Sequence, residues 1–228
     1  MRRAVLVTRP EPGLSETVQA VQSRGWRAVA CPVMRMAHRP PIADRPCRVM
    51  LVTSSQALPF LAHQDRDRLL LTVGSRTAER AEAMGFRHVE AASGTQEGLE
   101  TLCRQKGLSG PDLMLACGRG RHGQRYGADL AESLGAQWVE AYQVQPMSCL
   151  SDAALVALAE EQVEAVLFYS SETVSLFMEL CPLDQREALM RCRAVCLSQA
   201  IAERVEGFHT WGVVEVGEPS ALPGMISE

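Results

Sequence analysis

The feature that most constrains this chain is a strand–turn–helix pattern that occurs twice in the same order. Val49–Val52 leads into Thr53-Ser54-Ser55, and Val166–Phe168 leads into Tyr169-Ser170-Ser171. A second apolar run and a helical segment follow in each copy. Alternating strands and helices favour parallel sheets with helices on both faces. The pattern therefore predicts an α/β fold made of two similar parallel-sheet halves.

A second unit, strand–helix–strand, also occurs twice. Ala4–Val7 is followed by a helical segment that ends at Gly25, and Leu113–Cys117 by one that ends at Gly135. Glycine is the residue expected just after a helix. Aligning the two glycines gives an offset of 110 residues (135 − 25) and brings Thr8 opposite Gly118 and Arg9 opposite Arg119.

Two irregular segments are the best candidates for linkers. Arg39–Arg48 contains three prolines, and Gln145–Asp152 lacks periodicity. The chain could be cut there into sequential halves, or residues 1–37 could join the C-terminal part. The hydrophobic pattern does not choose between these two arrangements.

Composition excludes several classes of protein. The 228 residues have a formal net charge of −4, which argues against a nucleic-acid binder. No apolar run is long enough to cross a bilayer, and the N-terminal apolar stretch is too short for a signal peptide. The eight cysteines form no CxxC pair, so neither a disulfide framework nor a metal site is expected. We expect a cytoplasmic protein without membrane association.

Small polar residues stand where the predicted strands end. In parallel α/β sheets, ligands bind beyond the carboxyl ends of the strands, and helix N-termini there favour anions. The predicted ligand carries many acidic groups, although serine and threonine at these positions are also ordinary helix caps. The residues are Thr8, Arg9, Thr53, Ser54, Ser55, Gly74, Thr77, Gly118, Arg119, Tyr142, Ser170, Ser171 and Ser198.

The segment Gly118–Gly123 has the spacing G-x-G-x-x-G, and Glu140 lies twenty residues after Gly120. This is the dinucleotide-binding fingerprint, so an NAD(P)-dependent oxidoreductase is one alternative function. The arginines of the segment suit carboxylates as well as phosphates, and a solvated surface loop is also compatible with them. A non-catalytic, two-lobed module that closes on an anion is a further alternative.

No serine-nucleophile elbow, P-loop or paired-carboxylate motif occurs. An enzyme of this kind would work by orienting its substrate and by supplying a modest acid. Tyr142, at a strand end, is the best candidate for that acid, and packing between domains is its alternative role.

Several segments together resemble the uroporphyrinogen-III synthase family. Leu6-Val7-Thr8-Arg9-Pro10 resembles the family's opening, Val52-Thr53-Ser54-Ser55-Gln56-Ala57 its F-T-S-x-x-A-V, and Val73-Gly74-Ser75-Arg76-Thr77-Ala78 its V-G-x-x-T-A. Ala141-Tyr142-Gln143 and Phe168-Tyr169-Ser170-Ser171 follow in the family's order. The second G-x-T-T-A is replaced by Ser198-Gln199-Ala200-Ile201-Ala202, so two threonine hydroxyls are missing.

The resemblance implies two α/β domains joined by a two-stranded connector, with the N-terminal segment packed in the C-terminal domain. The domains would be 1–37 with 146–228, and 40–143. The implied activity is cofactor-free closure of hydroxymethylbilane with inversion of its last pyrrole. Tyr142 would assist loss of the hydroxyl, and Thr8, Arg9, Ser54, Gly74, Thr77, Gly118, Arg119, Ser170 and Ser198 would bind substrate. We expect a monomer that takes its substrate from hydroxymethylbilane synthase, with no metal.

Overall fold

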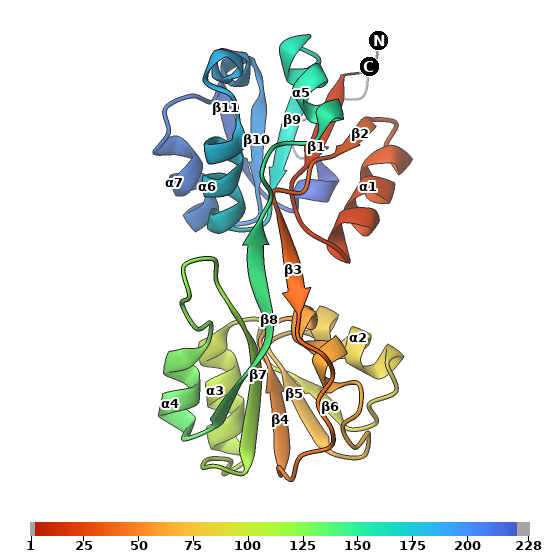
Figure 1. Cartoon of the computed structure of the whole chain (residues 1–228), viewed down its shortest axis with the longest axis vertical. Helices are drawn as coiled ribbons and strands as arrows, with labels where there is room; N and C mark the ends of the chain where they lie inside the picture. Colours follow the sequence, from red (N-terminus) through yellow and green to blue (C-terminus); the bar gives the residue numbers. More distant parts are fainter. Residues whose placement is uncertain (1–2, 223–228) are drawn as a thin grey trace. The chain divides into compact units, whose positions relative to one another are not determined.

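The computed structural model describes residues 3–222 and divides into two compact units. Unit 1 contains the residues up to Arg35 and those from Pro146 onward, and unit 2 is Met36–Gln145. Within residues 3–222, no helix is both long enough and apolar enough to cross a membrane. Each unit is an α/β structure and is described by itself (Figure 1).

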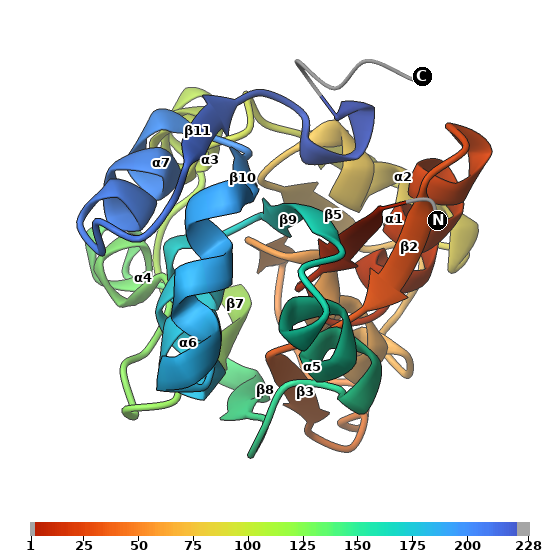
Figure 2. The ribbon, with the colours of Figure 1, turned by 90° about the horizontal axis from the view of Figure 1, so that it is seen from above.

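Unit 1 is built on a five-stranded parallel sheet with the order β11-β10-β9-β1-β2, which Figure 2 shows from above. Strand β1, from the start of the chain, therefore lies between β9 and β2. The elements in chain order are β1 Ala4–Val7, α1 Gly13–Ser23, β2 Arg27–Ala30, α5 Asp152–Ala159, β9 Val163–Phe168, α6 Ser171–Leu180, η2 Leu183–Arg191, β10 Arg193–Cys196, α7 Gln199–Glu206, β11 Val213–Val216 and η3 Pro219–Ala221.

Both faces of this sheet are buried, which explains why β1 is apolar throughout and why Ala165–Phe168 of β9 is a continuous apolar run rather than an alternating one. Val5, Val7 and Leu167 pack on one face with Val21 of α1. On the other face, the ring of Phe168 meets the ring of Phe177 on α6 edge to face, with 5.7 Å between centroids. The hydrophobic sequence of β1 and β9 thus dictates a three-layer arrangement.

Unit 2 is built on a six-stranded sheet with the order β3-β8-β7-β4-β5-β6. Strand β3 begins at Met34 and β8 ends at Pro146, so these two strands carry the chain across both unit boundaries. The elements are β3 Met34–His38, β4 Val49–Val52, η1 Ser55–Leu61, β5 Leu69–Thr72, α2 Ser75–Ala83, β6 Val89–Ala91, α3 Gln96–Gln105, β7 Leu113–Arg119, α4 Ala128–Leu134 and β8 Gln137–Pro146.

Strands β3 and β8 form an antiparallel pair. The N–H of Arg39 donates to the carbonyl of Ala141 at 2.8 Å, and the N–H of Met147 donates to Val33 at 3.0 Å. Moving six residues forward on one strand moves six residues back on the other, which is the antiparallel register. The other strand pairs in the two sheets, as far as residues 3–222 show them, are parallel.

Unit 2 also has helices on both faces of its sheet. Leu51 and Leu115 belong to a buried cluster with Leu99 of α3 and Leu130 of α4. Helix α2 and the 3₁₀ helix η1 contact each other away from that cluster. In Figure 1, α3 and α4 lie on one side of this sheet and α2 on the other.

The two sheets share one strand order once β9 is matched to β4. In unit 1, β10 and β11 follow β9 on one side, and β1 and β2 follow it on the other. In unit 2, β5 and β6 follow β4 on one side, and β7 and β8 follow it on the other. Gly25 and Gly135 end the corresponding first helices with φ of 83° and 65°, the left-handed conformation that favours glycine. The predicted fold class, two similar parallel-sheet α/β units, is confirmed.

The expectation of a linker at Arg39–Arg48 is wrong. The side chain of Gln64, only 3% exposed, donates to the carbonyls of Ile42 and Ala43 and accepts from the N–H of Arg45. Arg68 forms an ion pair with Asp44 at 2.9 Å. The prolines remove backbone donors but leave the carbonyls free to accept, so the segment packs on unit 2 as an ordered strap.

Candidate active site

Each sheet has one point where the strand order changes direction, and most of the predicted site residues stand there or next to it. In unit 1 the point lies between β9 and β1, and in unit 2 between β4 and β7. The connections that leave the carboxyl ends of these two strands turn in opposite directions, and α/β proteins bind ligands at such points. The fold therefore brings the predicted residues together in two sets, one in each unit.

Arg9 follows β1 and is half-buried in unit 1. Its guanidinium lies over the ring of Tyr169, 4.1 Å from the centroid, and its Nη1 donates to the hydroxyl of Thr17 at 3.4 Å. A Cβ atom at Gly13 would overlap the guanidinium, so the first turn of α1 forms the other wall. Within residues 3–222, Arg9 forms no ion pair.

The other predicted residues of unit 1 differ in accessibility. Thr8 is fully buried and its hydroxyl donates to the carbonyl of Leu167 at 2.6 Å, so it ties β1 to β9 and offers no surface to a ligand. Ser170 caps α6 by accepting from the N–H of Thr173 at 3.2 Å. Ser198 begins α7 but makes no such bond, and it is exposed. Its hydroxyl is therefore available.

In unit 2, Ser54 caps η1 by accepting from the N–H of Gln56 at 3.3 Å. Gly74 begins α2, and its carbonyl accepts from the N–H groups of Thr77 and Ala78. Thr77 is 8% exposed in the first turn of that helix. These residues stand after β4 and β5, so they line the carboxyl edge as predicted.

Tyr142 extends from β8 across the neighbouring strand β7. Between the two strands the register shifts by one residue, from Cys117 opposite Glu140 to Gly118 opposite Tyr142. A Cβ atom built on Gly118 would lie 2.8 Å from the Tyr142 hydroxyl oxygen and closer still to two ring carbons. The tyrosine, 5% exposed, thus occupies space that only a glycine at position 118 leaves open. Bulges of this kind re-aim side chains beside active sites.

Gly118 is therefore not the first residue of a glycine-rich loop, as the sequence analysis expected. It is part of β7, which continues to Arg119. In the structure its Cα side faces the ring of Tyr142. The ring of His38 on β3 completes this environment, with its centroid 6.3 Å from that of Tyr142.

Arg119 is held in a network of charges. Its Nε donates to Glu140 at 2.6 Å and its Nη1 to the carbonyl of Gly123 at 2.9 Å, while Arg39 donates to the other oxygen of Glu140. Burial alone would raise the pKa of the Glu140 carboxyl, but the two arginines outweigh it and hold the pKa below its ordinary value. Glu140 therefore neutralises much of the charge that Arg119 was expected to offer.

The Gly118–Gly123 segment does not have dinucleotide-binding geometry. Its amides are used internally, because Gly120 N–H donates to Gln124 and Gly123 N–H to Gly120. Helix α4 begins only at Ala128, so no helix N-terminus follows the third glycine as the fingerprint requires. Within the described residues, no group of three or more His, Cys, Asp or Glu is placed to hold a metal ion.

Sequence reasoning missed two residues that organise these sets. Tyr169 was noted only as part of a turn, and Glu140 only as a ribose-binding acid. The sequence contained a signal for Glu140. The offset of 110 residues places Ala30 opposite Glu140, so only one of the two halves has an acid at this position. Pairing agrees, with Val7 opposite Ala30 and Cys117 opposite Glu140.

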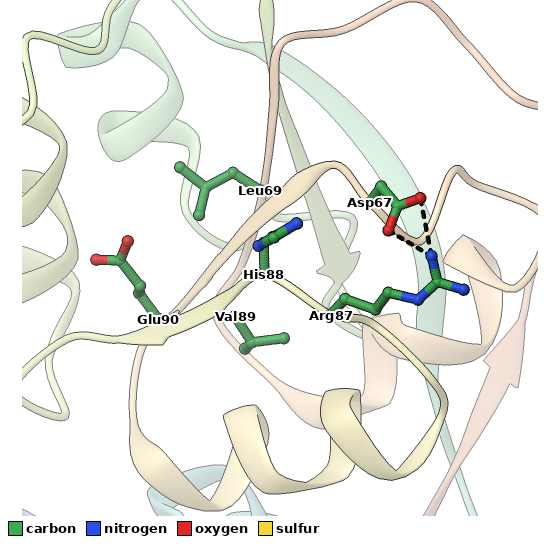
Figure 3. A pocket seen from close by; sticks show the side chains of 6 residues that line it. All are labelled: Asp67, Leu69, Arg87, His88, Val89 and Glu90. Carbon is green, nitrogen blue, oxygen red and sulfur yellow. Dashed lines mark hydrogen bonds and ion pairs between the residues drawn. The ribbon is translucent and has the colours of Figure 1, made fainter.

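A hollow of about 400 Å³ lies at the opposite edge of the unit 2 sheet, where β5 and β6 begin (Figure 3). Its charges are already paired, because Arg87 binds Asp67 at 2.7 Å and Glu90 binds Lys106 at 2.7 Å. The hollow is lined by Asp67, Leu69, Arg87, His88, Val89 and Glu90, and none of these was predicted as a site residue.

Comparison with known proteins identifies the relatives of this chain. The family model described as uroporphyrinogen-III synthase HemD matches residues 15–224. Uroporphyrinogen-III synthetase from Helicobacter pylori 26695 is similar with a TM-score of 0.60 and 14% identity, over 97% of this chain and 95% of that chain. A mutant uroporphyrinogen III synthase from the extremely thermophilic bacterium Thermus thermophilus is similar with a TM-score of 0.51 and 15% identity, over 96% of this chain and 95% of that chain. A search of curated protein sequences gave no match.

Proposed function

The chain belongs to the uroporphyrinogen-III synthase family, and from this premise we propose how it closes hydroxymethylbilane into uroporphyrinogen III. The alternative of a nicotinamide-dependent oxidoreductase has no support, since the Gly118–Gly123 amides are used within their own turn. The observation that carries the proposal is the family match over nearly the whole described chain.

The reaction begins when the terminal hydroxyl of the linear tetrapyrrole leaves as water, which gives a reactive azafulvene. The substituted carbon of the last pyrrole attacks this centre and forms a spiro intermediate. Fragmentation and re-closure give the ring with its last pyrrole inverted, and one water is the only by-product. The protein must favour this attack over direct closure, and a hundredfold preference needs about 2.7 kcal/mol of differential transition-state binding.

Substrate binding rests on the eight carboxylates that hydroxymethylbilane carries. Arg9 supplies a guanidinium that forms no ion pair with any residue between positions 3 and 222, and the exposed Ser198 supplies a hydroxyl that its own helix does not use. Ser54, Thr77 and Ser170 stand at helix starts, where free N–H groups favour anions. We assign Arg9, Ser54, Gly74, Thr77, Ser170 and Ser198 to substrate binding, with Thr8 and Arg119 in supporting positions.

Tyr142 is the proposed acid that assists departure of the hydroxyl. Its phenol is held across β7 by the register shift and by the space at Gly118. A proton passed from the phenol to the leaving oxygen gives water directly. The pyrrole that becomes the azafulvene loses its own N–H proton in the same step, and this proton restores the phenol. If Tyr142→Phe retains the full rate, this role is wrong.

The two compact units are proposed to act as domains that move about β3 and β8. We further propose a cytoplasmic monomer that receives its substrate from hydroxymethylbilane synthase. The cellular assignment is supported by the cysteines, because all eight are free thiols. Reduced thiols are the normal state in the cytosol.

An isomer assay tests the activity. Freshly generated hydroxymethylbilane is supplied with and without the protein, the products are oxidised, and type I and type III uroporphyrins are separated. Type III that depends on the protein supports the proposal. Only type I, from protein shown to be folded, would refute it and leave a non-catalytic anion-binding module.

A further inference from the structure

The two units contain arginines at corresponding positions, and the two differ in the residue that the neighbouring strand places beside them. Arg9 follows β1 and Arg119 ends β7, and the offset of 110 residues places them in the same position of the two sheets. Arg119 has Glu140 beside it at 2.6 Å. The position that corresponds to Glu140 is Ala30, which has no charge to offer. Among the residues that the structure describes, one of the two guanidiniums is therefore left without a counter-ion.

Two acids in segments next to Arg9 and Tyr169 have partners of their own. Glu11 accepts from the N–H and the hydroxyl of Ser15, at 3.2 and 2.6 Å. Glu218 accepts from the hydroxyl of Tyr169 at 3.3 Å and from Ser220. Burying part of an arginine without a carboxylate costs free energy unless something else pairs with it.

Arg9 is nevertheless held in a defined place by uncharged groups. The ring of Tyr169 lies under the guanidinium, and Gly13 and Thr17 of α1 lie against it. The ring is itself anchored, because Tyr169 packs on the buried cluster of Val5, Val7 and Leu167. A guanidinium fixed in this way keeps most of its five donors for an external partner.

From these contacts we infer that Tyr169 is a positioning residue that presents Arg9 as a two-pronged receptor for one substrate carboxylate. The inference rests on the proposed function, since the carboxylate belongs to the tetrapyrrole. A planar fork matches a carboxylate with two parallel hydrogen bonds, and an aromatic ring keeps the fork oriented without neutralising it. In this account Arg119, already paired with Glu140, is a structural residue.

Steady-state kinetics with hydroxymethylbilane test the inference through KM and kcat separately. Arg9→Gln is expected to raise KM about 10- to 100-fold, the value of a charge-assisted hydrogen-bond pair. Tyr169→Leu is expected to raise KM about 2- to 10-fold with little change in kcat, because it removes a cation–π contact. Tyr169→Phe keeps the ring and is expected to keep the wild-type KM.

Two further variants separate positioning from general stability. In the Arg9→Gln background, Tyr169→Leu should add nothing to KM, because the ring acts only through the guanidinium. Phe208→Leu is the matched control, because it removes a similar contact outside the proposed site. The guanidinium of Arg204, in the last turn of α7, lies 5.2 Å from the centroid of the Phe208 ring. This control should leave KM unchanged. A Tyr169→Leu effect that persists without Arg9, or that Tyr169→Phe reproduces, would overturn the inference.

A binding measurement keeps the inference separate from the catalytic proposal. Uroporphyrin I is a stable tetrapyrrole with eight carboxylates, and its affinity can be measured by fluorescence for wild type and Arg9→Gln. If wild type makes no type III product but binds this probe in an Arg9-dependent way, the proposed function fails and the carboxylate receptor stands. Equal affinity of the two proteins for the probe would refute the receptor, whatever the product assay shows.

Discussion

The contact between Gly118 and Tyr142 allows a sharp test of the proposed acid, through the substitution Gly118→Ala. The added methyl carbon would lie 2.8 Å from the phenol oxygen and closer to two ring carbons, whereas ordinary contact begins at 3.4 Å. The obstacle is the far end of a side chain, so we expect the ring to move and the strand to stay. A displacement of about 1 Å in a reacting group lowers a rate roughly 100-fold.

The expected result is a fall in kcat of about 100-fold with a modest loss of stability, about 1–3 kcal/mol for a crowded site. Both quantities are measured on one preparation, by rate of type III formation and by urea unfolding. In a Tyr142→Phe background, Gly118→Ala should lower kcat no further, because the hydroxyl is already gone. Gly207→Ala is the control, since its methyl carbon would meet only carbonyl oxygens at 3.6 Å.

The reasoning would be refuted by a Gly118→Ala enzyme with wild-type kcat and wild-type stability. It would also be refuted if the substitution lowered kcat equally with and without the Tyr142 hydroxyl. The second result would mean that Gly118 acts on the backbone or on the substrate rather than through the phenol.

Three further predictions concern single residues. Ser170→Ala should lower the free energy of unfolding by about 1 kcal/mol, because it removes a helix cap. Ser198→Ala should leave the free energy of unfolding unchanged and raise KM. Urea unfolding and steady-state kinetics measure the two quantities for both variants. Glu140→Gln should destabilise the protein by about 1 kcal/mol at pH 7. The pKa of Glu140 is lowered in the folded protein, so the stability difference between wild type and Glu140→Gln depends on pH. The difference should have its full size above the unfolded pKa of about 4.3 and should vanish as pH falls through the folded pKa. Of the described cysteines Cys149 is exposed, so a thiol reagent at neutral pH should give one fast reaction, which Cys149→Ser removes. Burial raises the pKa of Cys192 to about 12, so this thiol should stay unreactive until the protein unfolds.

The fold was accessible from sequence because both of its signals are local. Apolar runs such as Val49–Val52 are buried on both faces, and Gly25 and Gly135 stop helices by a backbone conformation that the sequence predicts. The strap at Arg39–Arg48 was not accessible, because a single buried glutamine, Gln64, organises it from about twenty residues away. Proline content alone does not reveal such a partner.

The positions of the candidate residues in the fold were predictable from the sequence, but their contacts were not. The candidates stand at the carboxyl ends of the strands, yet Thr8 is fully buried and Gly118 is a strand residue. Both outcomes depend on groups of neighbouring strands, the carbonyl of Leu167 and the ring of Tyr142, that only the register brings near. The unequal surroundings of Arg9 and Arg119 were present in the sequence as Ala30 and Glu140, but their meaning required the paired strands.

The position of β1 in the interior of the unit 1 sheet has a consequence for synthesis on the ribosome. Strand β1 is made first but pairs with β9, whose residues emerge more than 150 positions later. The whole of unit 2 is contiguous and emerges in between, so we expect it to fold while β1, α1 and β2 are still waiting for β9. The apolar strand Ala4–Val7 therefore waits for β9 through the synthesis of all of unit 2, and it is where a growing chain would need the protection of chaperones.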